Sequence, residues 1–303
     1  MELAEQPIEH IPVLAEALAE RINIPDDAIV IDATVGQAGH GYLFAEKLGK
    51  DGLFVGLDVD EKCIKAANER LKDFKCKVVL MRGNFANLKE ELEERQVQRV
   101  DFILADLGVC SSQLADIERG LSFQTPMPLD MRLDDRLETT AADIVNKTDE
   151  RSLADLIYKY GQERASRRIA RFIVQERSQS PIINTEQLSR IVCRALARPG
   201  KKARSRIHPA TRTFQALRIA VNNELESLQR LLCTAPDLLK KGGYIAVISF
   251  HSLEDRLVKD SFRQNAGKGI YKVITKKPVT ATRAQVAENP RARSAKLRIA
   301  QAL

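Results

Sequence analysis

The feature that most constrains the fold of this 303-residue chain is the alternation of short apolar runs with longer amphipathic stretches. The first four runs are rich in β-branched residues and lie at 28–32, 53–60, 77–85 and 100–109. Stretches with helical spacing separate them, at 42–49, 61–74 and 86–97. Strands that alternate with helices predict βαβ units and a parallel sheet covered on both faces. The near-continuous hydrophobicity of the runs agrees with such burial.

The alternation stops after the fourth run. Between residues 113 and 212 no strong strand run occurs, and three stretches have the spacing or the start signal of helices, at 153–161, 166–177 and 185–197. This interval is too long for a loop inside a compact domain. We therefore expect an inserted all-helical subdomain.

The alternation resumes after the helical interval. One long helix is expected over 212–241, with a break near Pro236. Three further strands follow, at 242–250, 271–278 and 295–303. The last two are close enough in sequence to run antiparallel to each other.

Seven strands in this order are typical of a Rossmann-like class I methyltransferase sheet rather than of a two-half dinucleotide fold. The expected organisation is an α/β methyltransferase domain in two parts, 1–112 and 213–303. The inserted helical domain, 113–212, is assigned to substrate recognition.

Charge is distributed unevenly along the chain. The net charge is +7, but residues 194–212 carry seven Lys and Arg and no acid, and residues 268–298 carry nine and one acid. These two segments together carry +15, which leaves −8 for the rest of the chain. An acidic body with two basic segments indicates a polyanionic partner such as a nucleic acid, although basic runs are also often solvated surface.

Several classes of protein are excluded. Five scattered cysteines without a Cys-x-x-Cys pair support neither a disulfide framework nor a zinc ribbon. Four histidines without a His-Glu-x-x-His motif give no support for a metal site, and no Gly-x-Ser-x-Gly elbow indicates a serine hydrolase. No apolar stretch approaches the ~18 residues of a membrane span, and the first ten residues lack the Lys and Arg of a targeting peptide. We expect a cytoplasmic protein without membrane association.

A glycine-bearing turn follows the first strand and opens a helix: Asp-Ala-Thr-Val-Gly-Gln-Ala-Gly-His-Gly at 32–41. Glycine lets the backbone turn tightly and lets a ligand approach the main chain. Asp58, at the end of the second strand, is placed where an acid typically accepts hydrogen bonds from ribose hydroxyls. The combination predicts a nucleoside cofactor; a packing turn with an unrelated surface acid is the alternative.

The turn favours S-adenosylmethionine over NAD. A pyrophosphate is typically bound by Gly-x-Gly-x-x-Gly, whereas the glycines here stand at 36, 39 and 41 with no Lys or Arg among them. S-adenosylmethionine has no phosphate, and the backbone N–H groups near 38–40 can bind its carboxylate. Phe85, after the third strand, is a candidate to pack against adenine, although a Phe at a strand end is more often ordinary core.

Asp106 ends the fourth strand. In parallel α/β sheets ligands bind outside the carboxyl ends of the strands where the strand order reverses, so Asp106 is expected near both cofactor and substrate. A carboxylate that accepts the N–H of an exocyclic base amine helps to localise the nitrogen lone pair and can take the proton. Binding of cofactor, or capping of the next turn, is the alternative role.

Ser249, Phe250 and His251 follow the fifth strand. Phe250 or His251 can stack on a base, or His251 can be a satisfied polar residue at a strand end. Ser252, three residues before Asp255, has the spacing of a helix cap.

The sequence resembles the MraW/RsmH family of bacterial 16S rRNA (cytosine-N4)-methyltransferases. The matching motifs cover nearly the whole chain: HIPVLAEAL (10–18), DATVGQAGHG (32–41), DLGVCSSQL (106–114), ERGLSF (118–123), PLDMRLD (128–134), HPATRTFQALRIAVNNEL (208–225), ISFHSLEDRLVK (248–259) and AENPRARSAKLRIA (287–300).

The resemblance implies methylation of N4 of a cytidine in the decoding region, with 16S rRNA, in the assembled small subunit, as the partner. The oligomeric state is left open, a homodimer included. Carried over by motif, the implied cofactor-binding residues are Gly36, Ala38, Gly39, His40, Asp58, Phe85, Asp106 and Gln113. Asp106 is the implied catalytic residue. The expected substrate-binding residues are Ser249, Phe250, His251, Lys201, Lys202 and Arg204.

Two departures from the family pattern stand out. The family turn usually reads Gly-Gly-His-Ser, where this chain has Ala38-Gly39-His40-Gly41. Ala38 is compatible with the backbone contact if its φ is negative. The segment between Lys259 and Arg283 is also shorter than is usual in the family, which bears on the substrate contacts of 260–282.

Two other functions fit parts of the sequence. A DNA amino-methyltransferase normally carries an Asn/Asp-Pro-Pro-aromatic motif after the fourth strand, and Asp106 is followed here by Leu-Gly-Val. A non-catalytic RNA-binding assembly factor on a methyltransferase fold would share the basic segments but would not need the cofactor.

Overall fold

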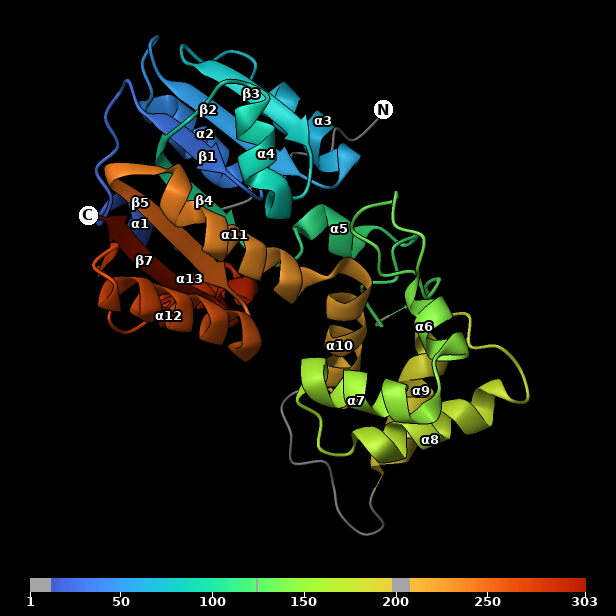
Figure 1. Cartoon of the computed structure of the whole chain (residues 1–303). Helices are drawn as coiled ribbons and strands as arrows, with labels where there is room; N and C mark the ends of the chain where they lie inside the picture. The colour runs from blue at the N-terminus through green and yellow to red at the C-terminus, as the bar shows by residue number, and fades with distance from the viewer. Residues whose placement is uncertain (1–11, 124, 198–207) are drawn as a thin grey trace, which may run out of the picture. The chain divides into compact units, whose positions relative to one another are not determined.

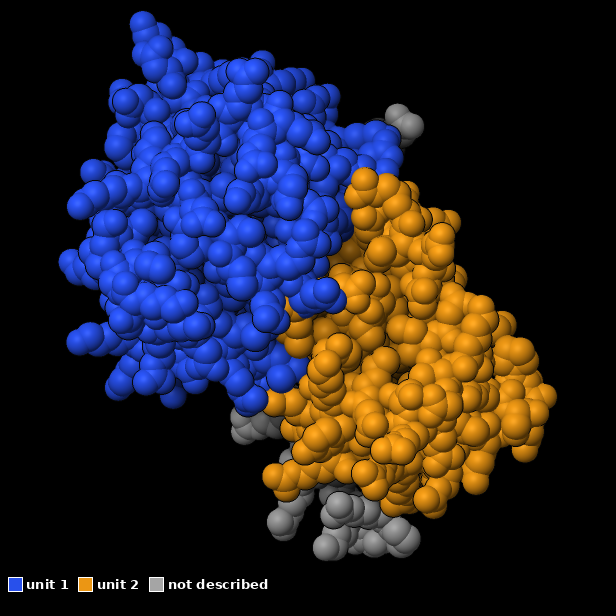
Figure 2. Space-filling model, viewed as in Figure 1, with its two compact units in different colours: residues 1–108, 226–303 blue, residues 109–225 orange. Residues whose placement is uncertain are grey.

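The computed structural model describes residues 12–123, 125–197 and 208–303 (Figure 1). Lys201, Lys202 and Arg204 lie outside the described residues. The chain divides into two compact units, residues 1–108 with 226–303 and residues 109–225, coloured separately in Figure 2. Among the helices that the structure describes, none is long and apolar enough to cross a bilayer.

The first unit contains a seven-stranded sheet in the order β3-β2-β1-β4-β5-β7-β6. Its strands are β1 (Ile29–Asp32), β2 (Leu53–Asp58), β3 (Lys77–Arg82), β4 (Val100–Asp106), β5 (Leu239–Ser249), β6 (Tyr271–Val273) and β7 (Lys296–Ala302). The first five run parallel, and β7 lies antiparallel between β5 and β6. The predicted sheet, with its closing antiparallel pair, is confirmed.

Helices cover both faces of this sheet (Figure 1). The helices of one face are α4 (Leu88–Glu93), α11 (Glu224–Leu238) and α12 (Ser252–Gly267). On the other face lie α1 (Ala15–Ala19), α2 (Gly39–Lys47), α3 (Glu61–Leu71) and the 3-10 turn η2 (Pro290–Ser294). Each face buries alternate residues of the strands, which explains why the strand sequences are apolar almost throughout. Two short elements complete the unit, η1 (Phe85–Asn87) and α13 (Arg283–Glu288).

The second unit is helical and has its own core. Its helices are α5 (Ser111–Ala115), α6 (Ala141–Lys147), α7 (Glu150–Gly161), α8 (Ser166–Arg177), α9 (Thr185–Leu196) and α10 (Thr211–Asn222). The amphipathic spacing puts Leu153, Ile157, Ile169, Ile173 and Leu188 into that core with 2% exposure or less. The helix α9 begins after its N-cap Asn184, whose side chain accepts the N–H of Gln187.

The long helix expected over 212–241 is instead two helices. The break falls at Asn223, which has a φ of 50° and caps α10 in the left-handed conformation. Pro236 lies inside α11. The α10 helix buries Phe214 and Leu217 in the helical core, so the boundaries of the second unit fall at 108/109 and 225/226 rather than at 112/113 and 212/213.

Candidate active site

Three acids lie at one edge of the sheet. Asp32, Asp58 and Asp106 are the last residues of β1, β2 and β4, which are neighbouring parallel strands. The register pairs Asp32 with Gly56 and with Leu104, so the three strands end close to the same level. This is the carboxyl edge of the sheet, where ligands of open α/β folds bind.

Asp58 holds the glycine-bearing turn. Its Oδ2 accepts the N–H of Gly36 at 2.9 Å, and its Oδ1 accepts the N–H of Asp60 at 2.9 Å. Asp60 in turn accepts the N–H of Lys62 and caps α3. One carboxylate therefore ties the first turn to the second strand.

Ala38 adopts a left-handed conformation, with φ 58° and ψ 38°. The negative φ that the sequence analysis required of Ala38 is therefore not found. The turn reverses direction just before α2 and needs the conformation that glycine adopts freely and alanine adopts at a cost of roughly 1–2 kcal/mol. Ala38 caps α2 without any side-chain hydrogen bond, so the first N–H groups of α2, from Gly39 onwards, have no side-chain acceptor at the cap.

Asp32 is a site residue that the sequence reasoning did not single out. It is 1% exposed, its Oδ1 accepts the N–H of Thr34 at 3.1 Å, and Thr34 Oγ1 accepts the N–H of Asp106 at 2.7 Å. Burial raises the pKa of Asp32 to about 6; the charge of Asp106 adds to this rise, and His40 and the hydrogen bonds of Thr34 oppose it. The available signal was an acid that ends an apolar strand directly before the glycines.

His40 lies in the first turn of α2 and is 5% exposed. Its Nε2 is 3.5 Å from Oδ2 of Asp106. Neither His40 Nε2 nor Asp106 Oδ1 has a hydrogen-bond partner within the described part of the chain. Buried polar atoms of this kind normally find partners, so the pair indicates a site that binds a polar ligand.

Phe85 follows the carboxyl end of β3 and begins η1, which Asn84 caps through the N–H of Ala86. It is partly buried and packs against the core cluster on the α4 side of the sheet. Its position past the end of β3 is compatible with packing against an adenine. Its core contacts are those of an ordinary core residue.

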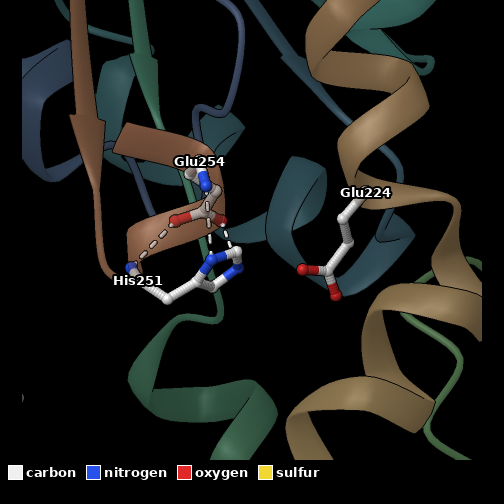
Figure 3. Close-up of side chains that lie close together, drawn as sticks. All are labelled: Glu224, His251 and Glu254. Atoms are coloured by element: carbon white, nitrogen blue, oxygen red, sulfur yellow. Dashed lines mark hydrogen bonds and ion pairs between the residues drawn. The ribbon is translucent and has the colours of Figure 1, made fainter. Parts of the chain in front are cut away.

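The segment after β5 is organised around Glu254. Its Oε2 accepts the N–H groups of Phe250 and His251 at 2.8 and 3.2 Å. Its own N–H donates to His251 Nδ1 at 3.4 Å, and Figure 3 shows the contacts between His251 and Glu254. The capping box therefore consists of His251 and Glu254 rather than of Ser252 and Asp255. These hydrogen bonds fix the orientation of the His251 ring, whose Nε2 lies 3.1 Å from Glu254 Oε1.

Two predicted residues of this region have other contacts. Ser249 is 1% exposed and donates to the carbonyl oxygen of Lys296 at 3.4 Å. Phe250 packs over Gly108, where an added Cβ would lie 3.3 Å from its ring. Because β5 neighbours β4, both residues lie at the carboxyl edge next to the end of β4.

Gln113 belongs to the second unit. It is buried in α5, and its Oε1 accepts the N–H of Cys110 at 3.0 Å. The structure thus gathers most of the predicted site at one edge of the first unit: Gly36, Ala38, Gly39, His40, Asp58, Phe85, Asp106, Ser249, Phe250 and His251.

This strand order, with an acid-lined glycine turn at the carboxyl edge, defines a Rossmann-like class I methyltransferase that uses S-adenosylmethionine. The residues fit that cofactor, because α2 begins with N–H groups that no side chain caps and Asp58 ends β2. The chain belongs to the MraW methylase family, whose family model matches residues 7–303.

Relatives named "Ribosomal RNA small subunit methyltransferase H" match along almost their whole length. The protein of Koribacter versatilis is 46% identical, over 97% of this chain and 94% of its own length. That of Clostridioides difficile is 42% identical, over 96% and 98%, and that of a Cyanothece strain is 47% identical, over 97% and 95%.

Proposed function

We propose that this chain transfers the methyl group of S-adenosylmethionine to N4 of a cytidine in the decoding region of 16S rRNA, with the small ribosomal subunit as substrate. The observation that carries the proposal is the buried, unpaired Oδ1 of Asp106 at the carboxyl edge of β4, among the described residues. The names of the relatives support the small-subunit rRNA as the substrate class.

The cofactor residues follow from the turn. The N–H groups of Gly39 and His40 bind the carboxylate of the cofactor at the start of α2. The N–H of Ala38 donates to the carbonyl oxygen of Val35 at 2.7 Å, so Ala38 contributes through the left-handed turn that places these two groups. Asp58 accepts from the ribose hydroxyls, and Phe85 packs against the adenine. Gln113 is proposed as a further contact on the resemblance alone. When bound, the cofactor supplies an electrophilic methyl group on a sulfonium.

Asp106 acts on the cytosine amine. The lone pair of N4 is delocalised into the ring, and a carboxylate that accepts one N–H of the amine makes this lone pair more available. The new N–C bond forms as the S–C bond breaks, and the amine proton passes to Asp106. The hydrogen bond from the Asp106 N–H to Thr34 holds the backbone in place. The rest of the rate enhancement comes from positioning the reactants.

The substrate must present an unstacked base. We propose that Phe250 and His251 contact this base and that Ser249 supports their segment. The basic residues Lys201, Lys202 and Arg204 contact phosphates, which position the RNA but do not specify its sequence. If so, substitution of Lys201 and Lys202 makes the salt dependence of RNA binding shallower by roughly 0.7 per lost single-strand phosphate contact.

The test uses labelled S-adenosylmethionine and small subunits from a strain that lacks the modification. The expected result is label on one cytidine, at N4, with competition by RNA and not by DNA. Absence of transfer to any small-subunit substrate would overturn the proposal. A thermal-shift titration separates the enzyme from a non-catalytic assembly factor, because a protein that binds S-adenosylmethionine is stabilised by it.

A further inference from the structure

A small basic cavity lies in the first unit between α12 and the end of the sheet formed by β6 and β7. Four cationic side chains line it, Lys259, Arg263, Lys276 and Arg298, together with Phe262 and Thr275. Its volume is about 130 Å³, whereas sites for drug-sized ligands measure roughly 300–1,000 Å³. The size and charge suit a single small anionic group.

Arg298 is the most buried of the four cations of this lining. It is 6% exposed and lies in β7, opposite Val247 of β5. Its Nε donates to Oδ1 of Asp255 at 2.6 Å, and this is the one hydrogen bond of its guanidinium to the described residues. A guanidinium carries five N–H donors, so the terminal amino groups are free to donate to a ligand in the cavity.

The charges around the cavity leave a positive excess. Asp255 is shared between Arg298 and Lys296, whose Nζ lies 3.2 Å from Oδ2. Lys259 lies 3.5 Å from Asp260, and both side chains are well exposed. Four lining cations thus face two neighbouring carboxylates, which favours an anion over a neutral group.

The cavity is at the same edge of the sheet as the candidate active site. The strand β6 runs parallel to β5, so Thr275 and Lys276 lie past its carboxyl end. Thr275 fixes this loop, because its Oγ1 accepts the N–H of Ile299 at 2.8 Å. With strands about 4.8 Å apart, β7 and β6 lie roughly 10–15 Å from β4, which Asp106 ends.

We propose that this cavity binds one phosphodiester group of the RNA strand that carries the target base, a few nucleotides from it. The inference rests on the proposed function, since it assigns the phosphate to that substrate. A phosphate held at this distance fixes the register of the strand without reading a base. The buried guanidinium and the flanking ammonium groups provide the charge-assisted donors that phosphate oxygens accept.

The experiment compares the double variant Lys259→Gln/Lys276→Gln with the matched control Lys50→Gln/Lys75→Gln. The control substitutions remove the same charge. Lys50 and Lys75 are exposed and precede β2 and β3, at the opposite edge of the sheet. The cavity variant should raise the KM for small subunits roughly tenfold or more, with kcat and S-adenosylmethionine binding unchanged. Its salt slope for RNA binding should be shallower by about 0.7, and the control should match the parent protein.

Three outcomes separate the possibilities. A KM and a salt slope equal to those of the control overturn the inference. A titration with inorganic phosphate that is lost in the cavity variant, without any change in RNA binding, also overturns it and assigns the cavity to a free anion. Failure of the parent protein to transfer a methyl group overturns the proposed function instead, and equilibrium RNA binding then still tests the cavity.

Discussion

The imidazole Nε2 of His40 and the carboxylate Oδ2 of Asp106 lie 3.5 Å apart. His40 comes from the first turn of α2 and Asp106 from the end of β4, so the pair joins the glycine-bearing turn to the strand that ends at the proposed catalytic carboxylate. The second oxygen of Asp106 has no hydrogen-bond partner among the residues described. One oxygen of the carboxylate is therefore oriented beside His40, and the other is available to a donor from outside the protein.

The first prediction concerns the substitution Asp106→Asn. An amide cannot take the amine proton, so kcat should fall by about 10²–10⁴, the usual contribution of a general base. The hydrogen bond to Thr34 uses the backbone N–H of Asp106, so the fold should persist. Thermal stabilisation by S-adenosylmethionine measures separately whether the cofactor contact implied for Asp106 is also lost. Initial rates with labelled cofactor measure the effect, with the exposed Asp51→Asn as the control. Turnover within tenfold of the parent protein would remove Asp106 from the chemistry.

The second prediction concerns the pH dependence of stability. The pKa of Asp32 is about 6 in the folded protein and 3.8 for an ordinary Asp. Between these values the folded state binds the proton and the unfolded state does not, so the free energy of unfolding decreases as the pH rises through this window. Asp32→Asn cannot ionise, so its stability relative to the parent should increase by roughly 2–2.5 kcal/mol between pH 4 and pH 7.

Denaturant unfolding at a series of pH values, without cofactor, measures this difference. Asp51→Asn is exposed and should follow the parent curve within about 0.5 kcal/mol. A parallel course of the Asp32→Asn and parent curves across the window would show that Asp32 is already ionised in the folded state.

Much of the fold follows from local patterns in the sequence. The strands that end at Asp32, Asp58 and Asp106 are apolar runs bounded by polar turns, and their parallel order follows from the intervening helices. Because parallel strands share a carboxyl edge, the meeting of these acids could also be predicted. The raised pKa of Asp32 could not, since it depends on burial by elements distant in the sequence.

Other features of the structure go against the local preferences of the residues that form them. Asn223 ends α10 in the left-handed region, where the sequence alone made Pro236 the better candidate for a break. Ala38 adopts a positive φ that its Cβ disfavours. His251 caps α12 although Ser252 has the stronger intrinsic preference for that position. In each case the tertiary structure overrides a local preference.

The third prediction concerns the contact of α7 with α10. A Cβ on Gly161 would collide with the carbonyl oxygen of Arg212, a backbone atom that cannot rotate away. Gly161→Ala should therefore lower the free energy of unfolding of the helical unit by about 1–3 kcal/mol. Gly267→Ala is the control, because its Cβ would meet no atom within 4 Å, and it should be neutral or gain up to about 1 kcal/mol. Equal stability of the two variants would contradict the close approach of the helices.

The fourth prediction concerns the ion pair of Asp255 with Arg298, whose side chains are 15% and 7% exposed. Burial tends to raise the pKa of Asp255, but the hydrogen bonds and charges of Arg298 and Lys296 outweigh it, so this pKa lies below its usual value. Asp255→Asn leaves the Arg298 guanidinium buried without its counter-charge and should cost about 3–5 kcal/mol at pH 7.

The pH dependence of this loss identifies its cause. A lowered folded pKa stabilises the protein above the ordinary pKa of an Asp, and that contribution disappears as the pH falls through the folded value. The difference in free energy of unfolding between Asp255→Asn and the parent protein, measured by denaturant titration, should therefore become smaller below pH 4. Asp260→Asn, on the same helix but 60% exposed, should stay within about 0.5 kcal/mol of the parent at every pH. A gap that is constant with pH would mean that packing, rather than the charge of Asp255, holds Arg298 in β7.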